Sequence, residues 1–596
     1  MFSKRVSVNL FYFGFLFVGL SFLHGYHALL IDGATSIERI YFVIQAVGQS
    51  FLETLAALIL IQVLPRAFLP WIITLTAVLF VARIVDFPLV RLLGLSFWDA
   101  TTFISKEHIY NFVEQLYSSN VSIGIWITGA LVGFAIVELA VVAFYLTEKY
   151  AKKWELSLPS LIWTFSGVCF FFVLIECAGL FFVRGIAYEN YAQALPWKRG
   201  ILQRDGALVT LPFTLKAKEF TTEVAVEPIK NKPDIYLFVA ESLRDDFITR
   251  DVAPNLAQFR KENIRLDLTL SNANATQPSW FSIFHSRFPM YWGSSIPKGA
   301  LPMKILKEMG YKIHVYTSAR LSFFRMDEVI FGEDTYLADS IFTFFGNEGE
   351  PLYARDGKVI DKLCEDMQKE SGGRVFVVFL DSTHFDYSWP PAETCFSPIE
   401  DPVNYVKLAF FKGNLEPLKN RYRNALSYVD SLFGQVVDKL KGKKESIVVF
   451  TGDHGEEFYE KGHLFHASAL TIEQTGVPIY YKMGKKPLTK MSSHIDIFPS
   501  ILHYLTGDDR YSAYFDGQSI FSRNRLPFLL SARYNLGRTP YEFMLHNGKS
   551  RLLARFSNES EIFKSDAVRI LTLEDVEEKH IAQEFGEAFD FLFSTR

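Results

Sequence analysis

Three clusters of polar residues each follow an apolar stretch, and they contain the side-chain types that bind divalent metals. The clusters are Glu241-Ser242, residues 381–384 (DSTH) and residues 451–457 (TGDHGEE). Carboxylates and imidazoles supply the O and N ligands that such cations prefer. Any one cluster is compatible with an ordinary strand-end cap or turn. Three together, each directly after an apolar run, favour a metal site.

A candidate nucleophile, Thr276, lies in a segment that is small and polar and then becomes helical. This segment is residues 271–282 (SNANATQPSWFS). A hydroxyl near a helix N-terminus is favoured as an oxyanion by the helix dipole and the free N–H groups, and a metal lowers its pKa further. The alternative is that Thr276 only caps the helix.

The elements around these residues alternate between strands and helices. Apolar runs predict buried strands at 234–240, 374–380 and 446–450, and residues 312–317 also read as extended. Helical patterns cover 255–262, 304–309, 361–368 and 421–440. Such alternation predicts an α/β domain with a mostly parallel sheet covered on both faces. Because chemistry in these folds sits at the carboxyl edge of the strands, we expect the three clusters to meet there.

Composition separates the chain of 596 residues into two parts. Residues 1–185 carry 22 of the 126 charged side chains, so this part is about half as charged as the rest. The 57 Phe residues and the positive mean hydropathy of +0.14 argue against disorder and indicate lipid contact. A net charge of −4 excludes a bulk polycation, and we expect no nucleic-acid partner.

Five segments of the first part are long and apolar enough to span a bilayer as helices. They cover about residues 8–30, 40–64, 68–87, 121–146 and 160–183. Most basic residues of this part fall on one side if the N-terminus is cytoplasmic: Lys4, Arg5, Arg66, Lys149, Lys152 and Lys153. By the positive-inside rule, everything after Arg184 then lies outside the cytoplasm. The alternative, a set of buried core helices, would need a soluble layer around them.

Ionisable residues within or near these spans have two interpretations. Charges are costly in hydrocarbon, so we expect them to face the bundle, water or a lipid headgroup. They are Glu53, Arg83, Asp86, Arg91, Glu138 and Glu176. One interpretation is a headgroup site, with Arg83, Asp86 and Arg91 as its best candidates. The other is interfacial snorkelling and helix pairing.

The predicted organisation has four parts. They are a transmembrane domain at 1–185, an interfacial linker at 186–232, a catalytic domain at 233–525 and an extension at 526–596 that completes the soluble domain. The linker begins with aromatic and basic residues at 196–199, as expected near a membrane surface. Cys364 and Cys395 are candidates for one disulfide outside the cytoplasm.

In combination these motifs resemble the alkaline phosphatase and sulfatase superfamily. The motifs on which this resemblance depends are Glu241-Ser242, T-x-P-S at 276–279, TGDHGE at 451–456 and SHIDIFPSIL at 493–502. Five spans before such a domain resemble the membrane-anchored branch, which includes lipoteichoic acid synthases and the phosphoethanolamine and phosphoglycerol transferases. The resemblance implies an α/β alkaline phosphatase-like domain after a five-helix transmembrane bundle, in the inner membrane of a bacterium with the catalytic domain periplasmic or extracellular.

The resemblance also implies roles for single residues. Glu241, Thr276, Asp453 and His454 match the metal ligands of that branch, with Thr276 as the nucleophile. His384 and His466 fall where the transferases have histidines near the substrate phosphate, and His463 is an alternative to His466. Relatives hold Zn²⁺ or Mn²⁺, and the Irving–Williams order favours Zn²⁺.

The implied function is transfer of a phosphoethanolamine or phosphoglycerol headgroup from an anionic or zwitterionic phospholipid to an envelope glycan or lipid. Two alternatives are a membrane-bound hydrolase that uses water as acceptor and a lipid-sensing regulator that turns nothing over. True sulfatases convert a Cys or Ser at the position of Thr276 to formylglycine, which Thr cannot form. Trp280 stands where an Arg is usual, and the domain can hold at most one of the several disulfides of lipid A transferases.

Overall fold

The computed structural model describes most of the chain. The described residues are 6–31, 34–93, 96, 123–185, 187–188, 191, 206–292, 298–344, 350–369, 372–411, 413–441, 445–534, 540–558 and 561–595. Among the residues used above, Lys4 and Arg5 and the linker start at 196–199 lie outside these ranges. The chain divides into two compact units, Met1–Ala207 and Leu208–Arg596, and each is described by itself.

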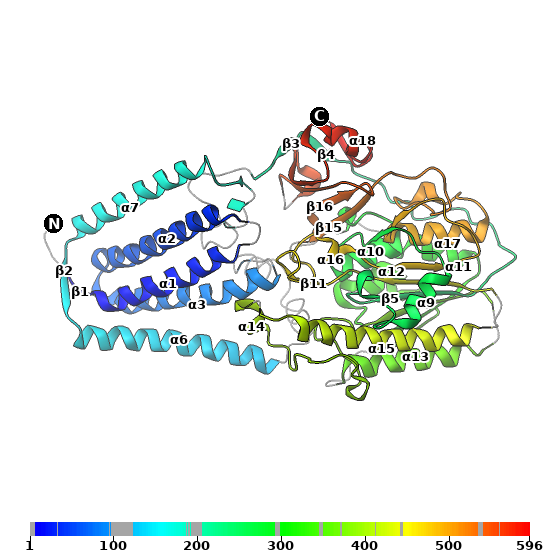
Figure 1. The fold of residues 1–596 in the computed structure, drawn as a ribbon, viewed down its shortest axis with the longest axis horizontal. Coiled ribbons are helices and arrows are strands. Elements are labelled where there is room, and N and C mark those ends of the chain that lie inside the picture. The colour runs from blue at the N-terminus through cyan, green and yellow to red at the C-terminus, as the bar shows by residue number, and fades with distance from the viewer. Residues whose placement is uncertain are drawn as a thin grey trace. The chain divides into compact units, whose positions relative to one another are not determined.

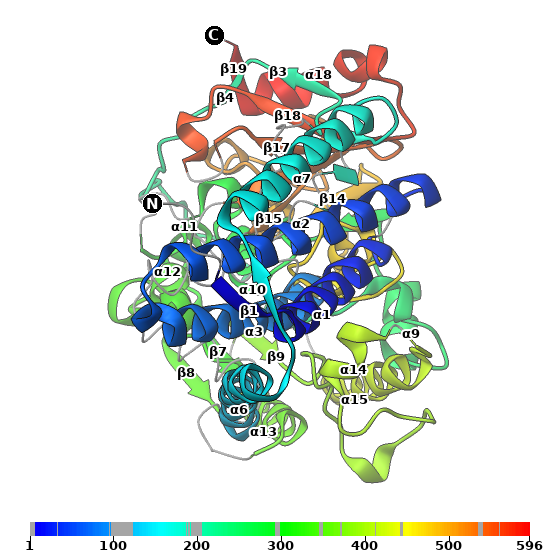
Figure 2. The ribbon, with the colours of Figure 1, turned by 90° about the vertical axis from the view of Figure 1, so that its left-hand side faces the viewer.

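The first unit, called the membrane unit below, contains the five predicted apolar helices. They are α1 (Leu10–Leu29), α2 (Ser36–Val63), α3 (Leu69–Leu93), α6 (Ile123–Tyr150) and α7 (Leu158–Gly179). Each is long and apolar enough to cross a membrane, which confirms the prediction of five spans. Figure 2 shows α2 packed against α1 and α7, and α3 packed against α1 and α6. A short antiparallel pair, β1 (Val6–Asn9) with β2 (Lys153–Leu156), joins the start of this unit to the α6–α7 connection.

Several ionisable side chains of the membrane unit make polar contacts with a neighbouring helix. Arg83 on α3 donates to Glu53 on α2 at 3.2 Å, as the helix-pairing interpretation requires. Arg91 donates to the carbonyl of Leu30 at 3.0 Å. His24 on α1 lies 3.0 Å from the hydroxyl of Ser50 on α2. These contacts link neighbouring helices. Such links matter in a bilayer, because the hydrophobic effect does not drive apolar helices together there.

The second unit, the soluble unit, is built on a six-stranded sheet. Its order is β13-β10-β5-β9-β7-β8, and only β13 is antiparallel to its neighbour. The strands are β5 (Ile235–Ala240), β7 (Lys312–Thr317), β8 (Ser340–Thr343), β9 (Arg374–Leu380), β10 (Ile447–Gly452) and β13 (Ile479–Lys482). The predicted mostly parallel α/β sheet is therefore confirmed, and β5, β7, β9 and β10 lie where the apolar runs place them.

Helices cover both faces of this sheet because its strands are apolar on both sides (Figure 1). Leu237 and Val239 of β5 belong to the same buried cluster as residues of α10 (Thr276–His285), α11 (Leu301–Glu308), α12 (Met326–Phe331) and α17 (Ile497–Thr506). Phe238, on the opposite face, packs edge-on against Phe433 of α15 (Glu416–Leu440) at 5.3 Å between ring centroids. Helices α9 (Pro254–Glu262) and α13 (Leu352–Asp366) both pack against α15.

Helix α13 begins nine residues before the predicted start at 361, because a tertiary contact overrides a local signal. No helix is predicted from the sequence over residues 352–360. In the structure the Asp356 carboxylate is buried and accepts the backbone N–H groups of Asp381 and Ser382 after β9. Cys364 on this helix is buried while Cys395 is exposed, and both are free, so the candidate disulfide does not form.

A second sheet completes the soluble unit in the order β15-β16-β17-β18-β3. It consists of β15 (Leu529–Tyr534), β16 (Pro540–His546), β17 (Arg551–Phe556), β18 (Val568–Glu574) and β3 (Val209–Leu211), followed by α18 (Ile581–Leu592). Next to β3, β4 (Phe213–Leu215) pairs with β19 (Phe593–Thr595). Residues 209–215 fall in the segment predicted as an interfacial linker, yet they are strands of the soluble unit. Their alternating sequence gives too little signal to predict a pairing with residues so distant in the chain.

Candidate metal centre

The central strands of the sheet bring the three polar clusters to one edge. Strand β5 lies between β9 and β10, and Ala240 is in register with both Leu380 and Gly452, the last residues of those strands. Glu241, Asp381 and Asp453 therefore leave the sheet at the same level. This arrangement is the meeting point that the parallel strands predict.

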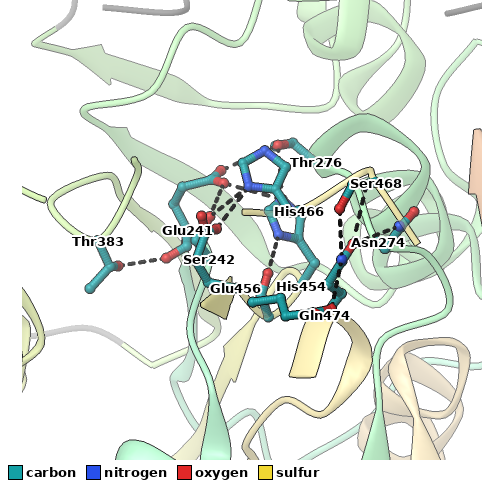
Figure 3. Close-up of polar contacts among 12 residues, drawn as sticks. Glu241, Ser242, Asn274, Thr276, Thr383, His454, Glu456, His466, Ser468 and Gln474 are labelled. Atoms are coloured by element: carbon teal, nitrogen blue, oxygen red, sulfur yellow. Dashed lines mark hydrogen bonds and ion pairs between the residues drawn. The ribbon is translucent and has the colours of Figure 1, made fainter. Parts of the chain in front are cut away.

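Thr276 is the first residue of α10 and its hydroxyl does not cap that helix. The N-cap position is Ala275, which has no side-chain oxygen to bind a backbone N–H. The Thr276 Oγ1 lies 3.3 Å from Oε2 of Glu241 and 3.3 Å from Nε2 of His454 (Figure 3). The hydroxyl thus points to the carboxylate and imidazole at the sheet edge, which disfavours the capping interpretation.

The backbone fixes the tautomer of His454. Its Nδ1 lies 3.0 Å from the carbonyl oxygen of Gly455, and a carbonyl can only accept, so Nδ1 carries the proton. Nε2 lies 3.2 Å from Oε1 of Glu241, and it presents a lone pair to a metal once it has lost its own proton. A buried imidazole held in this way has the form that metals bind. Burial lowers the pKa of His454, but the Glu241 carboxylate outweighs it and the pKa is raised.

Asp453 has one satisfied oxygen and one without a partner. Oδ1 accepts the backbone N–H groups of Ser242 and His454 at 2.9 and 2.8 Å. Oδ2 is buried, has no hydrogen-bond partner among the described residues, and lies 3.7 Å from Nε2 of His454. Burial and the nearby Glu241 carboxylate raise the pKa of Asp453 well above its ordinary value. An unpaired buried carboxylate oxygen is costly unless a cation compensates it.

The spacing of the four predicted ligand groups fits one ion. Four of the six distances among these groups are given above, and they run from 3.2 to 3.7 Å. A tetrahedral ion with bonds of about 2.0–2.2 Å requires ligand atoms roughly 3.3–3.6 Å apart. The distances that link the groups are therefore close to those around a bound divalent cation.

His466 and His384 both lie near the centre. The ligand atoms of His466, Glu241 and His454 all lie within 4.8 Å of one another, so His466 is a further possible ligand. Its Nδ1 lies 2.8 Å from Oε2 of Glu456. The rings of His384 and His466 are 6.1 Å apart between centroids. Burial lowers the pKa of His384 to about 4, although Glu241 acts in the opposite sense.

His463 is not in this group, although its spacing in the sequence made it an alternative to His466. The two histidines flank β12 (Leu464–Phe465), which pairs with β11 (Glu457–Phe458). The backbone N–H of His463 donates to Glu457 at 2.9 Å, and its carbonyl accepts from Tyr459 at 2.7 Å. The two histidines thus lie at opposite ends of this short strand.

Two residues of the centre had no predicted role. Ser242 contacts both carboxylates of the centre, and Glu456 holds the ring of His466 (Figure 3). Glu456 is fully buried and also accepts from the hydroxyl of Tyr387 at 3.0 Å. Both residues stand within the predicted polar clusters, but residue type alone does not separate them from caps and turns.

The profile of the Sulfatase family matches residues 233–507, which contain every residue of this centre. Residues 233–507 are a sulfatase domain. The five apolar helices thus precede a domain of the alkaline phosphatase superfamily, as the motifs predict.

Relatives of known sequence match more weakly and over part of their length. A Haemophilus influenzae protein described as uncharacterized is 21% identical over 352 residues, covering 58% of this chain and 51% of its own. The Kdo(2)-lipid A phosphoethanolamine 7''-transferase of Escherichia coli K12 is 24% identical over 188 residues, covering 31% and 32%. This chain therefore spans about half of the first relative and about a third of the second.

Among solved structures, the full-length lipooligosaccharide phosphoethanolamine transferase A of Neisseria meningitidis is similar with a TM-score of 0.49 and 14% identity. The match covers 84% of this chain and 96% of that one.

Proposed function

We propose that this chain transfers a phospholipid headgroup, phosphoethanolamine in the first place, to an envelope glycan or lipid through a phosphothreonine at Thr276. The observation that carries the proposal is the Thr276 hydroxyl, which lies 3.3 Å from both Glu241 and His454 instead of capping α10. The relatives from Escherichia coli and Salmonella typhimurium are both named as phosphoethanolamine transferases, which favours phosphoethanolamine over phosphoglycerol.

The first step breaks one ester bond of the donor and forms another. The Thr276 oxygen attacks the phosphorus, and its proton passes to Glu241 Oε2, which already accepts from that hydroxyl. The bond from phosphorus to the diacylglycerol oxygen breaks, and that oxygen takes a proton. In the second step an acceptor hydroxyl attacks phospho-Thr276 and gives its proton to the group that protonated the diacylglycerol oxygen; the bond from phosphorus to Thr276 breaks, and Thr276 regains its proton from Glu241. The sum is headgroup transfer with release of diacylglycerol.

We assign the proton donor to His466 and a neutral contact with the phosphate to His384. The Glu456 carboxylate accepts from Nδ1–H of His466 at 2.8 Å and orients the ring, so the other ring nitrogen can serve the leaving oxygen. Burial keeps His384 neutral near pH 7, because its pKa is lowered to about 4. Both histidines were candidates for this step, and the buried Glu456 distinguishes them.

Glu241, Thr276, Asp453 and His454 would hold the divalent ion of this proposal. When bound, the ion lowers the pKa of the attacking hydroxyl and offsets the negative charge that grows on the phosphate oxygens. We favour Zn²⁺ over Mn²⁺, because four groups at 3.2 to 3.7 Å suit a tetrahedral ion better than a six-coordinate one.

Purified full-length protein, incubated with headgroup-labelled phosphatidylethanolamine or phosphatidylglycerol and an envelope lipid fraction, tests the function. We expect diacylglycerol to appear together with label on a second lipid or glycan, more from phosphatidylethanolamine. Diacylglycerol with free labelled headgroup would indicate a hydrolase. Lipid binding without diacylglycerol, in the presence of Zn²⁺ or Mn²⁺, would indicate a sensor and contradict the proposal.

We also propose that the soluble unit lies outside the cytoplasm of a bacterial inner membrane. Cys395 is exposed in the soluble unit, whereas Cys364 is buried there. The other two cysteines, Cys169 and Cys177, lie in α7. Cys395 is therefore a native labelling site that reports on which side of the membrane the soluble unit lies. A membrane-impermeant maleimide should label cells after the outer membrane alone is opened, and Cys395→Ser should remove the signal. Labelling only after the inner membrane is opened would reverse the topology.

A further inference from the structure

Ser242 is in contact with both carboxylates of the metal centre. It directly follows β5 and is fully buried. Its backbone N–H donates to Oδ1 of Asp453 at 2.9 Å, and its hydroxyl donates to Oε1 of Glu241 at 2.9 Å (Figure 3). The same hydroxyl lies 3.4 Å from Nδ1 of His466. One small residue therefore touches three of the groups that surround the proposed ion.

The contacts of Ser242 select which carboxylate oxygens remain available. An ionised carboxylate only accepts hydrogen bonds, and each of the two carboxylates receives one donor from Ser242. Asp453 keeps Oδ2 without a partner, and Glu241 keeps Oε2 directed at the Thr276 hydroxyl. Without the Ser242 hydroxyl, Oε1 of Glu241 loses this donor, and the Glu241 carboxylate is then free to present either oxygen, or both, to an ion.

The backbone at Ser242 is in an unusual conformation that the surroundings maintain. Its φ of +53° lies in the left-handed region. Residues other than glycine rarely adopt this region, because it strains the backbone. The hydroxyl of Tyr422 on α15 donates to the carbonyl of Ser242 at 2.8 Å and accepts the N–H of Arg244 at 3.0 Å. The turn is therefore held from outside by a helix that contributes no ligand.

Gly452 allows this turn to approach Asp453 closely. A Cβ at Gly452 would lie 2.6 Å from the carbonyl oxygen of Leu243, which is closer than atoms can pack. The absence of a side chain there lets residues 242–243 lie directly on the end of β10. The N–H of Ser242 consequently reaches the carboxylate of the next residue, Asp453.

We propose that Ser242 is a positioning residue that orders Glu241 and Asp453 for the ion before it binds. Ser242 is not a ligand and does not touch the substrate; it fixes which oxygens face the ion. The inference rests on the metal site of the proposed function, but not on the reaction or its substrates. Outer contacts of this kind typically contribute 10- to 100-fold to metal affinity.

The test is a Zn²⁺ titration of metal-free, full-length protein in detergent, with a competing chelator to set the free concentration. Ser242→Ala should bind Zn²⁺ about 10- to 100-fold more weakly than the wild type. Ser242→Gly removes the same hydroxyl but relieves the backbone strain, so it should lose as much affinity as Ser242→Ala. Ser446→Ala is the matched control. Ser446 directly precedes β10, at the end of that strand away from the metal centre. It is buried as well, and its hydroxyl has no partner among the described residues.

The outcomes separate this inference from the proposed function. Wild-type affinity in Ser242→Ala, or full recovery in Ser242→Gly, would overturn the role of the hydroxyl while the metal site stands. An equal loss in Ser446→Ala would also overturn it, because the effect would then be general. Absence of Zn²⁺ and Mn²⁺ binding by the wild type would overturn the metal site itself. The apparent unfolding temperature of each metal-free variant, expected to stay near that of the wild type, shows that the variants fold.

Discussion

The two carboxylates of the metal centre differ from two carboxylates of the membrane unit in the partners that compensate their charge. In the membrane unit, Glu38 receives a two-pronged ion pair from Arg184 at 2.7 and 2.9 Å, and Glu53 pairs with Arg83 at 3.2 Å. In the soluble unit, Glu241 and Asp453 converge, and the cationic partners that the described residues offer Glu241 are imidazoles. Glu38 and Glu53 thus each have an arginine partner, whereas the ion-pair partner that the described residues give Glu241 and Asp453 is the imidazole of His454.

The difference teaches how to distinguish a structural charge from a ligand. In a one-to-one pair with arginine the charge of the carboxylate is already compensated. Removing one partner leaves the other charge uncompensated. Two carboxylates that face each other, with one oxygen unpaired, are complete only when a cation is added. Four experiments test whether this distinction holds, beginning with the largest expected effect.

Thr276→Ala should reduce headgroup transfer by at least about 10⁴-fold, because no other group can form the covalent intermediate. Metal content should fall only in part, since Glu241, Asp453 and His454 remain. Release of diacylglycerol from labelled phosphatidylethanolamine measures the rate, and Ser282→Ala on the buried face of the same helix is the control. Turnover within tenfold of the wild type would remove Thr276 from the mechanism.

Asp453→Ala should abolish stoichiometric metal binding, because it removes a carboxylate oxygen of the centre that has no partner among the described residues. Elemental analysis of protein purified without chelator measures Zn and Mn together. Asp430→Ala is a useful comparison, since that buried carboxylate is occupied by the backbone N–H groups of Asn255 and Leu256. Equal metal in the wild type and Asp453→Ala would contradict the site, and Mn without Zn would contradict only the choice of ion.

Arg83→Leu should destabilise the membrane unit by roughly 3 kcal/mol, because it leaves Glu53 without its cation among apolar helices. The double variant Arg83→Leu/Glu53→Leu should recover most of that loss, as two matched apolar residues carry no uncompensated charge. The apparent unfolding temperature in detergent measures both. If the double variant is no more stable than Arg83→Leu, the two residues do not act as a structural pair.

Acid should weaken the soluble unit through His285, which is buried on α10 with Nε2 2.9 Å from the carbonyl of Val329. Burial lowers its pKa from 6.5 to about 4. Between these values the unfolded chain binds the proton and the folded one does not, so stability is lost as the pH falls from about 6.5 to 4, by at most roughly 3 kcal/mol.

His285→Gln keeps a donor for Val329 but cannot titrate. Its unfolding temperature should therefore fall less than that of the wild type between pH 7 and pH 4.5. Identical pH dependence in the two proteins would show that His285 is not responsible.

The sequence permits prediction of the central sheet and of most of the centre for one physical reason. Strands β5, β9 and β10 are continuous apolar runs, and parallel strands end at a common edge, so the residues that follow them must meet. Glu241, Asp453 and His454 come together in this way, and Thr276 reaches them from the start of α10.

Other features depend on backbone geometry and distant pairing that residue types do not reveal. The role of Ser242 depends on a left-handed φ and on Tyr422, which is 180 residues away. The choice between His463 and His466 depends on the two-residue strand between them. The second sheet depends on β3, which pairs with β18 more than 350 residues later in the chain.

The pairing of β4 with β19 has a consequence for the order of synthesis. Ser594 and Thr214 of these strands are 380 residues apart, so β4 leaves the ribosome long before its partner exists. At about 5–20 residues per second, β4 waits on the order of tens of seconds with an unpaired edge. During that interval the five apolar helices are already made, whereas β4 of the soluble unit can pair only when translation reaches β19. A nascent chain that stalls before β19 therefore presents an open edge, which chaperones and proteases can recognise.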